Sequence, residues 1–553
     1  MLKKIFKKVL LTALLTFTLN PVFADEAEDE LEGKAESEKT EETKKASDIN
    51  ADIQREFNIA IASTNFNLNP HTAAYSMEAQ ILDGLYEGLY SYDPRTLEPK
   101  NALATKCKIS RDKKRHTYEI RKGAKFSDGS PINAYSVRNA WLMLLSTPNA
   151  PYASFLDCVK GVKEFRNGKV SESEVGIIAR DDNTLVLHLL YPASHLNKIL
   201  CHHAFSVKTG SDNVFSGAFV IKERADNTIL LEKNQNYWDA ENVQIPSIRI
   251  TTSDEITDNA WKYNAGEIDW IASVFNAKKI LNPNAVHLSA IFGTEYIFFK
   301  CQNPPWDRAD FRNALMAAVP WAALRKNILV PATTLVYPLA GYPKVDGLTD
   351  TEAEEAIYLM QEAKKSAGMK ESDKLKIKFE LTAVSDRQKE FFQILSDAWK
   401  PLGVELEASI TNDYRYVESI SESEADLFVY SWIGDFADPL AFLELFKDGS
   451  TLNQTVWKNE KFNDLLKQAA ETTDSDTHNK LLSQAETALL DDGVVMPIRH
   501  SMSLNAVNTN AVGGWYTNAL DIHPYKYLYF KDYKQKIPNV VKLEKKNEIS
   551  AKN

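Results

Sequence analysis

Residues 126–192 place turn, helix and strand signals in an order that few globular sequences share. The stretch begins with a turn-forming run at 127–131, and Asn133 follows as a candidate helix cap. Apolar residues then recur at helical spacing until Pro148, which ends the helix. Apolar runs on either side of residues 181–183 indicate strands joined by a turn. The sequence here therefore predicts one helix followed by two strands.

Strand and helix patterns alternate in the later part of the chain. Residues 375–381 alternate between apolar and polar side chains, residues 391–398 carry a helical apolar stripe, and residues 404–406 return to a strand pattern. This β-α-β order predicts two parallel strands covered by a crossover helix. Another apolar strand at 425–432 ends close to the polar residue Asp435, and ligands of open α/β sheets gather at such carboxyl ends. The chain is therefore predicted to be an α/β protein.

Together these segments resemble the oligopeptide- and dipeptide-binding proteins of ATP-driven importers, family 5 of the solute-binding proteins. The resemblance covers nearly all of residues 57–530, with further matching segments at 216–220, 231–239, 266–269, 432–446, 457–459 and 485–497. It implies an α/β fold like that of periplasmic binding proteins, with two main lobes, a hinge and an inserted third subdomain. The lobes that it implies are lobe I from residues 51–86, 209–292 and 501–533, lobe II inserted at 87–208, and lobe III at 293–500.

Both ends of the chain differ from its middle. Residues 1–24 have four lysines, a short apolar core and a small residue at the exit, as in a secretory signal peptide, with an uncleaved interfacial helix as the alternative. Residues 25–50 hold eleven acids against four lysines, so they are expected to be a solvated tether unless they serve a specific partner. The lysine-rich residues 534–553 are expected to be a loose tail. A periplasmic protein is predicted, without a lipid anchor because no cysteine lies near residue 24.

The net charge and the cysteines limit the partners and the covalent chemistry. The formal charge of −11 becomes −15 without the four lysines of residues 1–24, and so acidic a chain is not expected to bind nucleic acid. The resemblance implies that a disulfide of some relatives is absent, because its positions match Gly293 and Ile433. Up to two disulfides and buried free thiols both stay open for the four cysteines, Cys107, Cys158, Cys201 and Cys301.

Asp435 is the principal candidate for a ligand contact. By the resemblance, an acid three residues after Trp432 pairs with the free α-amine of a bound peptide. A carboxylate in a closed cleft needs a cationic partner, and an ammonium group supplies one positive charge and three donors. The alternative is that Asp435 caps the helix expected at 439–446, although Asp438, directly before Pro439, suits that role better.

The resemblance implies further contacts around this anchor. Main-chain groups of Ser431 and Ile433 are expected to pair with the main chain of a peptide, which gives affinity without reading side chains. Residues 68–76 resemble a ligand-contacting strand of the first lobe, and Tyr152 matches a second-lobe tyrosine, with a packing role as its alternative. The predicted ligand-binding residues are Asp435, Trp432, Ser431, Ile433, Gly434, Tyr152, Ala74, Tyr75 and Ser76.

No catalytic motif accompanies these residues. Gly161 and Gly168 resemble a phosphate loop, but their spacing is too long and Val170 stands where a hydroxyl is needed. No Gly-x-Ser-x-Gly or His-Glu-x-x-His sequence occurs. His202 and His203 are expected to point to opposite faces of a strand, to be structural or exposed, and not to share a metal ion. The chain is therefore not expected to be an enzyme or to need a metal or cofactor.

These observations predict a monomeric periplasmic receptor that closes two lobes around a short peptide and delivers it to a membrane ABC permease. Val429 and Ala272 stand where some relatives have an arginine and a tyrosine, so peptide length stays open and a metal chelate or a sugar is the alternative cargo. Other classes of protein give alternative hypotheses for the function, which are a periplasmic hydrolase, a holdase and an adhesin.

Overall fold

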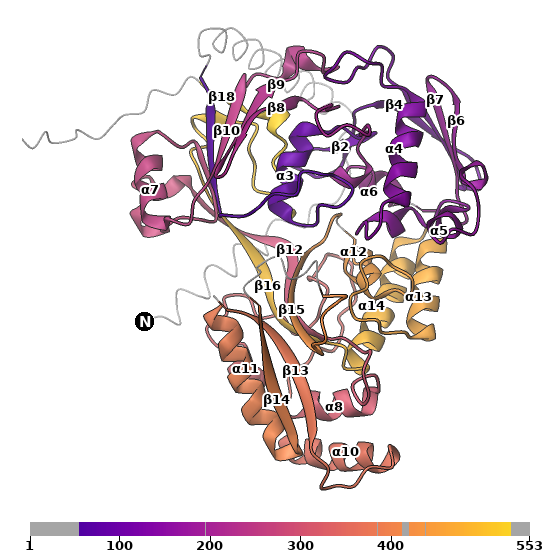
Figure 1. Ribbon diagram of the computed structural model, residues 1–553, viewed down its shortest axis with the longest axis vertical. Helices are drawn as coiled ribbons and strands as arrows, with labels where there is room; N and C mark the ends of the chain where they lie inside the picture. Colours follow the sequence, from indigo (N-terminus) through magenta and orange to yellow (C-terminus); the bar gives the residue numbers. More distant parts are fainter. Residues whose placement is uncertain (1–54, 194, 384, 412–419, 437, 532–553) are drawn as a thin grey trace, which may run out of the picture. The chain divides into compact units, whose positions relative to one another are not determined.

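A mixed sheet of ten strands runs through the protein in the computed structural model (Figure 1). Across the sheet the strands are β14 (Val404–Thr411), β13 (Leu375–Thr382), β15 (Leu427–Ile433), β12 (Val286–Phe299), β16 (Val495–Val507), β11 (Trp270–Ala272), β1 (Phe57–Ile61), β10 (Ser247–Thr252), β9 (Thr228–Lys233) and β8 (Phe219–Ala225). The two longest, β12 and β16, pair antiparallel in the middle of the sheet and link its two halves.

The structure describes residues 55–193, 195–383, 385–411, 420–436 and 438–531. The signal peptide, acidic tether and loose tail expected at 1–24, 25–50 and 534–553 lie outside these residues. Within them, no helix combines the length and the apolar character needed to cross a membrane.

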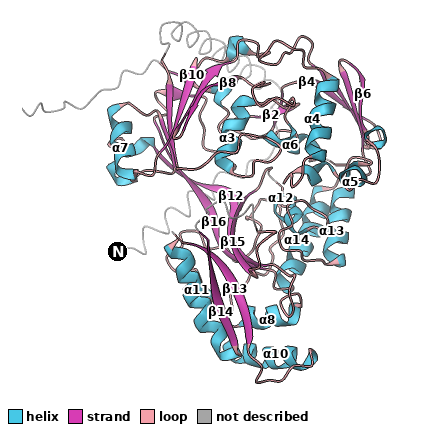
Figure 2. Ribbon diagram, viewed as in Figure 1, coloured by secondary structure: helices cyan, strands magenta, loops and turns pink. Residues whose placement is uncertain are grey.

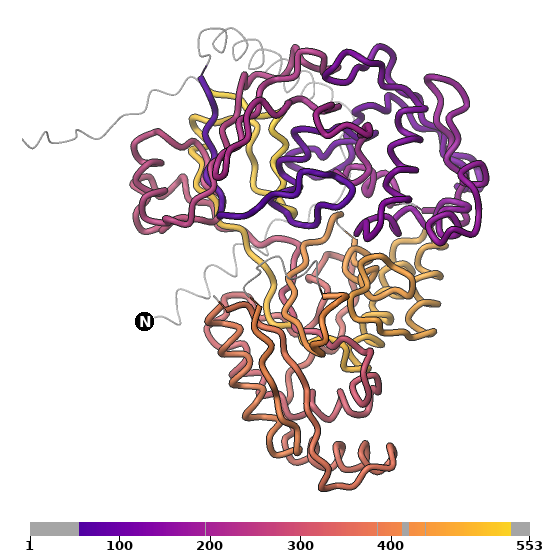
Figure 3. The backbone as a smooth tube through the Cα atoms, in the orientation of Figure 1, coloured from indigo at the N-terminus to yellow at the C-terminus, as the bar shows by residue number. Residues whose placement is uncertain are grey.

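Three segments that are far apart in the sequence build one half of the sheet. β1 lies parallel to both β10 and β11, and β11 pairs antiparallel with β16. Figure 3 shows the indigo start, the magenta middle and the yellow end of the tube running together in this half. A central strand near the start of the chain needs neighbours on both edges, and here later segments supply them. The boundaries predicted for lobe I stay a prediction.

The other half of the sheet contains the predicted β-α-β unit. β13 and β14 pair parallel over their whole length, and α11 (Asp386–Trp399) connects them and packs against both (Figure 2). Trp399 is fully buried and donates its indole N–H to the carbonyl oxygen of Leu315 at 3.0 Å. The prediction for residues 375–406 is confirmed. Neighbouring helices are α8 (Ala309–Ala317), α9 (Trp321–Leu324) and α10 (Ala353–Ser366).

The segment 87–208 has its own antiparallel sheet, of strands β4 (Ala104–Ile109), β5 (Arg115–Ile120), β7 (Thr184–His188) and β6 (Ile177–Asp181). Helix α4 (Ala134–Ser146) begins as predicted at Asn133, whose side chain accepts the amide of Ser136 at 3.0 Å. The helix and the two strands predicted within residues 126–192 are thus confirmed.

One apolar core contains residues of this segment and of the segment 293–500. All four cysteines are free thiols, so neither of the two disulfides left open by the sequence is present. The remaining helices and strands are α3 (Ser76–Leu85), α5 (Val162–Arg166), α6 (Leu196–Ile199), α7 (Ile256–Ala265), α12 (Leu440–Leu443), α13 (Glu460–Glu471), α14 (Ser475–Asp491), β2 (Tyr90–Tyr92), β3 (Pro99–Asn101), β17 (Val512–Gly513) and β18 (Tyr529–Phe530).

Candidate functional site

Strand β15 presents main-chain groups at an edge of the sheet. β15 pairs with β12 along its length, but within the described strands β13 pairs only with its first two residues. The amide of Gly434 donates to the carbonyl oxygen of Phe292 in β12 at 2.7 Å. Because main-chain groups alternate between the two edges of a strand, those of Ser431 and Ile433 face away from β12. They are therefore directed to the other edge of β15, along a stretch where β13 no longer pairs with it.

All nine predicted residues line one cavity of about 380 Å³. Its walls come from the start of α3, from Tyr152 and His202 in the segment 87–208, and from the end of β15. Volumes of this order are typical of ligand pockets. Whether the nine residues contact a ligand stays a prediction. The sequence singled out Val429 as a position where some relatives have an arginine, and it gave His202 and His203 no ligand role. The lining residues without any signal in the sequence are Ala79, Glu295, Gln388, Tyr430, Leu520 and Ile522.

The carboxyl group of Asp435 is buried against this cavity. Only 9% of the residue is exposed. Its Oδ2 has no hydrogen-bond partner among the described residues, and its Oδ1 lies 3.3 Å from Nε2 of His202. Burial raises the pKa of Asp435 well above its usual range, because the charged form loses its hydration. A cation brought by a ligand can compensate for this loss.

His202 faces Asp435 with a defined tautomer. Its Nδ1 accepts the amide hydrogen of Ala204 at 3.3 Å, so the proton of the neutral ring lies on Nε2, the atom that faces Asp435. Burial lowers the pKa of His202 to about 3, which keeps the ring neutral at physiological pH. Asp435 therefore faces a neutral N–H donor and not a positive charge.

The expected arrangement of His202 and His203 is wrong. The two rings have centroids 4.0 Å apart and lie at a 3-10 turn, where the side chains do not alternate as they do in a strand. Both residues are buried against the cavity. Across the described residues, no group of three or more His, Cys, Asp or Glu side chains is arranged to hold a metal ion.

Aromatic rings form one wall of the cavity. The ring centroid of Tyr152 lies 4.1 Å from that of His202 and 6.3 Å from that of Trp432. Trp432 stacks with Tyr430 and donates its indole N–H to the carbonyl oxygen of Ala441 at 2.8 Å. Tyr152 thus packs against its neighbours and lines the cavity at the same time, so its two predicted roles are compatible.

The first-lobe strand expected at 68–76 is a loop that leads into α3. The amides of Ala74 and Tyr75 both approach Oε2 of Glu78 at 3.3 Å, and Ser76 is already the first helical residue. A carboxylate at this position of a helix draws the preceding amides toward itself, so the chain turns before it can extend as a strand. Ala74, Tyr75 and Ser76 nevertheless line the cavity.

Helix α12 takes its capping acceptor from Asp438. The amide of Leu440 donates to Oδ1 of Asp438 at 2.9 Å, and Nε2 of His478 lies 3.1 Å from the other oxygen. The capping role considered for Asp435 thus falls to Asp438, which leaves Asp435 to the cavity.

The described walls of the cavity contain neither lysine nor arginine. Glu295, opposite Ser431 in the ladder of β12 with β15, already pairs with Arg499 through two hydrogen bonds of 3.1 and 2.8 Å. Arg387 lies 3.6 Å from the same carboxylate. Val429 lines the cavity where the resemblance implied an arginine in some relatives. A ligand anion therefore meets no free cation in these walls.

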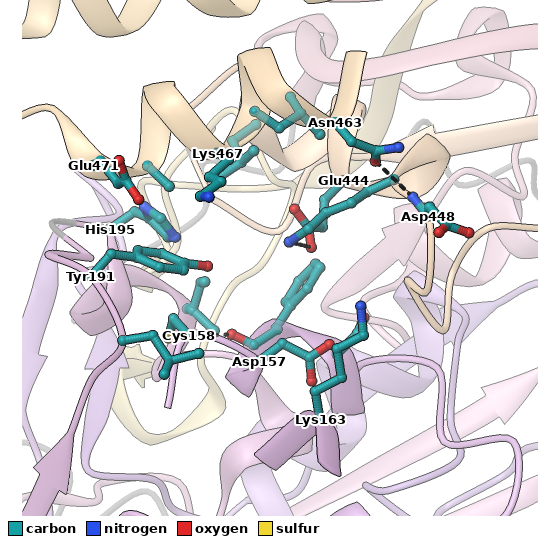
Figure 4. Close-up of a pocket in the computed structure, with 18 of the residues that line it drawn as sticks. Asp157, Cys158, Lys163, Tyr191, His195, Glu444, Asp448, Asn463, Lys467 and Glu471 are labelled. Carbon is teal, nitrogen blue, oxygen red and sulfur yellow. Dashed lines mark hydrogen bonds and ion pairs between the residues drawn. The ribbon is translucent and has the colours of Figure 1, made fainter. Parts of the chain in front are cut away.

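A larger cavity of about 510 Å³ is lined by charged side chains of both signs (Figure 4). Asp157 and Lys163 lie on one side, facing Asn463 and Lys467 of α13 on the other. Among its described residues, no buried side-chain nitrogen or oxygen lacks a hydrogen-bond partner. The cavity at Asp435 is therefore the candidate site. Ion pairs in and beside the larger cavity include Asp157 with Arg166 and Glu444 with Lys447, each at 2.7 Å.

An α/β fold whose sheet continues through two long strands, with a cavity at a strand end, is the arrangement that the resemblance to solute-binding proteins implied. Residues 98–454 match the family described as bacterial extracellular solute-binding proteins, family 5 Middle. This match covers more than half of the chain, and the protein belongs to that family. The family predicted from the sequence is confirmed.

Individual relatives are similar over most of their length. The chain is 28% identical over 473 residues to the oligopeptide-binding protein OppA of Bacillus subtilis, across 80% of this chain and 86% of the relative. It is 26% identical over 498 residues to the probable deoxycholate-binding periplasmic protein YgiS of Escherichia coli, across 84% and 90%. The solved structure of the Escherichia coli murein tripeptide binding protein MppA is similar with a TM-score of 0.76 at 23% identity, across 86% of this chain and 98% of that one. This likeness confirms the predicted fold of the periplasmic binding proteins.

Proposed function

We propose that this protein is the receptor of an ABC importer, and that it captures short peptides in the cavity at Asp435 and delivers them to a membrane permease. The observation that carries the proposal is the buried carboxyl group of Asp435, whose Oδ2 has no partner among the described residues. The α-ammonium group of a peptide brings one positive charge and three donors to this oxygen. Such a charge-assisted bond contributes about 1.5–3 kcal/mol net. The names of OppA and MppA agree with a peptide cargo.

The edge of β15 supports the same cargo. Ser431 and Ile433 direct main-chain groups away from β12, where an extended peptide can add to the strand through its own main chain. We propose that lobes I and III are the two halves of the large sheet and that β12 and β16 form the hinge between them. Closure of the hinge then encloses a peptide without making or breaking a covalent bond.

Calorimetry with tri-, tetra- and penta-alanine tests the proposal. The parent protein should bind at least one of them, and Asp435→Asn should weaken binding about tenfold to a hundredfold because an amide cannot pair with the ammonium charge. Asp258→Asn is the matched control, since Asp258 is an exposed acid that pairs with Lys262 on α7. Parent protein that binds none of these peptides would overturn the peptide proposal.

A non-peptide solute is the second candidate cargo. YgiS, a relative of similar identity, is named for deoxycholate, and here Val429 and aromatic rings form part of the cavity wall. An amphiphilic solute of that kind would use these apolar walls and would not need Asp435. Native mass spectrometry of protein purified without denaturation separates the two candidates, because co-purified peptides and a small apolar acid differ in mass.

A further inference from the structure

The carboxyl group of Asp435 meets a side chain from a distant part of the sequence. His202 belongs to the segment 87–208 and Asp435 to the segment 293–500, yet Nε2 of His202 lies 3.3 Å from Oδ1 of Asp435. Only 4% of the His202 side chain and 9% of the Asp435 side chain are exposed. This contact is therefore made away from solvent, where a polar contact is worth more than it is at the surface.

The two oxygens of Asp435 have different surroundings. Oδ1 faces the Nε2–H group of His202, whose tautomer is set by the amide of Ala204 on the other ring nitrogen. Oδ2 has no hydrogen-bond partner among the described residues. A carboxylate held through one oxygen offers the other in a fixed direction, which reduces the ordering that a ligand has to impose.

We propose that His202 is a positioning residue for amine recognition, which holds Oδ1 of Asp435 so that Oδ2 receives the ammonium group of the ligand. The inference rests on the proposed function and names the chemical class that the site selects, a solute with a protonated primary amine. It also makes the amine subsite a composite, complete only when the segments 87–208 and 293–500 are together.

A neutral donor suits this role better than a cation. A lysine or an arginine at position 202 would neutralise Asp435 and compete with the ammonium group of the ligand. A neutral imidazole N–H stabilises the carboxylate and leaves its negative charge for the ligand. Neighbouring rings also restrain the ring of His202. Its centroid lies 4.1 Å from the ring centroid of Tyr152 and 4.0 Å from that of His203.

A second contact fixes the main chain at the same point. The hydroxyl group of Tyr92 donates to the carbonyl oxygen of Asp435 at 3.2 Å, and Tyr92 also belongs to the segment 87–208. The backbone and the carboxyl group of Asp435 are thus both held by this segment. Removal of His202 is expected to free the carboxyl group to rotate while the backbone stays in place.

Calorimetry at pH 7 with tri-alanine and N-acetyl-tri-alanine tests the inference. The measured quantity is the amine ratio, the Kd of the acetylated peptide divided by that of the free peptide. His202→Leu should lower this ratio about tenfold, and His202→Gln should keep it within about threefold of the parent because its amide N–H can still donate. The control is His116→Leu, a buried histidine of the same segment that does not line the cavity and should leave the ratio unchanged.

The outcomes separate the inference from the proposed function. If parent protein binds neither peptide and binds no tetra- or penta-alanine either, the peptide function is wrong. If it binds tri-alanine and His202→Leu keeps the parent ratio, the positioning role is wrong and the function stands. Should His202→Leu not fold, ¹⁵N NMR of histidine-labelled parent protein decides. A ring with its proton on Nε2, whose signal shifts when tri-alanine binds, supports the role, and a proton on Nδ1 or an unshifted signal overturns it.

Discussion

Thr451 lies against Ser154 through three hydrogen bonds that join distant parts of the chain, one of them from the amide of Ser154 to Oγ1 of Thr451 at 3.3 Å. The amide of Thr451 donates to Oγ of Ser154 at 3.1 Å, and the two hydroxyl oxygens lie 2.9 Å apart. Oγ1 of Thr451 also donates to the carbonyl oxygen of Pro151 at 2.6 Å. Since Tyr152 lies between Pro151 and Ser154, these bonds fix the cavity wall to the segment 293–500.

Thr451→Val should weaken peptide binding about tenfold. Valine keeps the size and branching of threonine but removes the hydroxyl bonds to Pro151 and Ser154, each worth about 0.5–1.5 kcal/mol net. The arrangement in which the segments 87–208 and 293–500 lie together then becomes less populated, and the apparent Kd rises in proportion. Calorimetry with the best-bound alanine peptide measures the change. Thr487→Val, which removes a hydroxyl bond of 2.9 Å within α14, is the matched control, and equal affinities of the two variants would contradict the prediction.

Blocking the two ends of a peptide should have unequal effects. Acetylation of the amine removes the charge that Asp435 needs, so affinity should fall at least tenfold. Amidation of the carboxyl end should change affinity less than about threefold, because the described cavity walls contain no lysine or arginine to pair with it. Calorimetry with tri-alanine in its free, acetylated and amidated forms measures both. A larger loss on amidation than on acetylation would reverse the proposed orientation.

The affinity for a peptide should depend on pH in a bell shape. Burial raises the pKa of Asp435 in the empty site, so at lower pH the group is protonated and has to lose its proton before it can pair with an ammonium group. Affinity therefore increases as pH rises through this raised pKa. It falls again above about pH 8, where the α-amine of the peptide, with a pKa of about 7.7–8.0, loses its own proton. Calorimetry from pH 5 to 9 measures both limbs, and buffers of different ionisation enthalpy should reveal up to one released proton per bound peptide on the acid side.

The acid limb can be assigned to one residue. Asp435→Asn should remove both this limb and the proton release, and a variant that keeps them would place the titration elsewhere. Burial lowers the pKa of the neighbouring histidines and raises the pKa of the neighbouring tyrosines, so both shifts are away from neutral pH. The histidines are His202 and His203, and the tyrosines are Tyr92, Tyr152 and Tyr430.

Local patterns are sufficient to predict much of the fold. Asn133 and the helical spacing after it predict α4, and the alternation at 375–381 predicts β13. These features depend on neighbours within one turn or one strand, so their signal lies in a short window of sequence. The nine predicted residues line one cavity, and only the resemblance could place them together in advance, because they come from distant parts of the chain.

The missed residues depend on contacts that a short window does not contain. The sequence around His202 and His203 favours a strand, and the 3-10 turn that places both rings at the cavity has no clear signature in their neighbours. Glu78 ends the expected strand at 68–76 through bonds to the amides of Ala74 and Tyr75. An acid at the fourth position after Ala74 is a helix-start signal that could have revealed this turn.

The buried pair of Glu87 and Lys526 should be costly to break from one side. Nζ of Lys526 donates to both carboxylate oxygens of Glu87 at 3.0 and 2.7 Å, and Tyr237 donates to the same carboxylate. Glu87→Leu leaves the ammonium group buried without this partner and should lower the free energy of unfolding by about 3–5 kcal/mol. The double variant Glu87→Leu with Lys526→Leu should lose less, because no uncompensated charge remains. Urea unfolding followed by fluorescence measures both, with Glu232→Gln in the exposed Lys222 pair as the control, expected to cost less than about 1 kcal/mol. A double variant less stable than Glu87→Leu alone would show that Lys526 does not depend on Glu87.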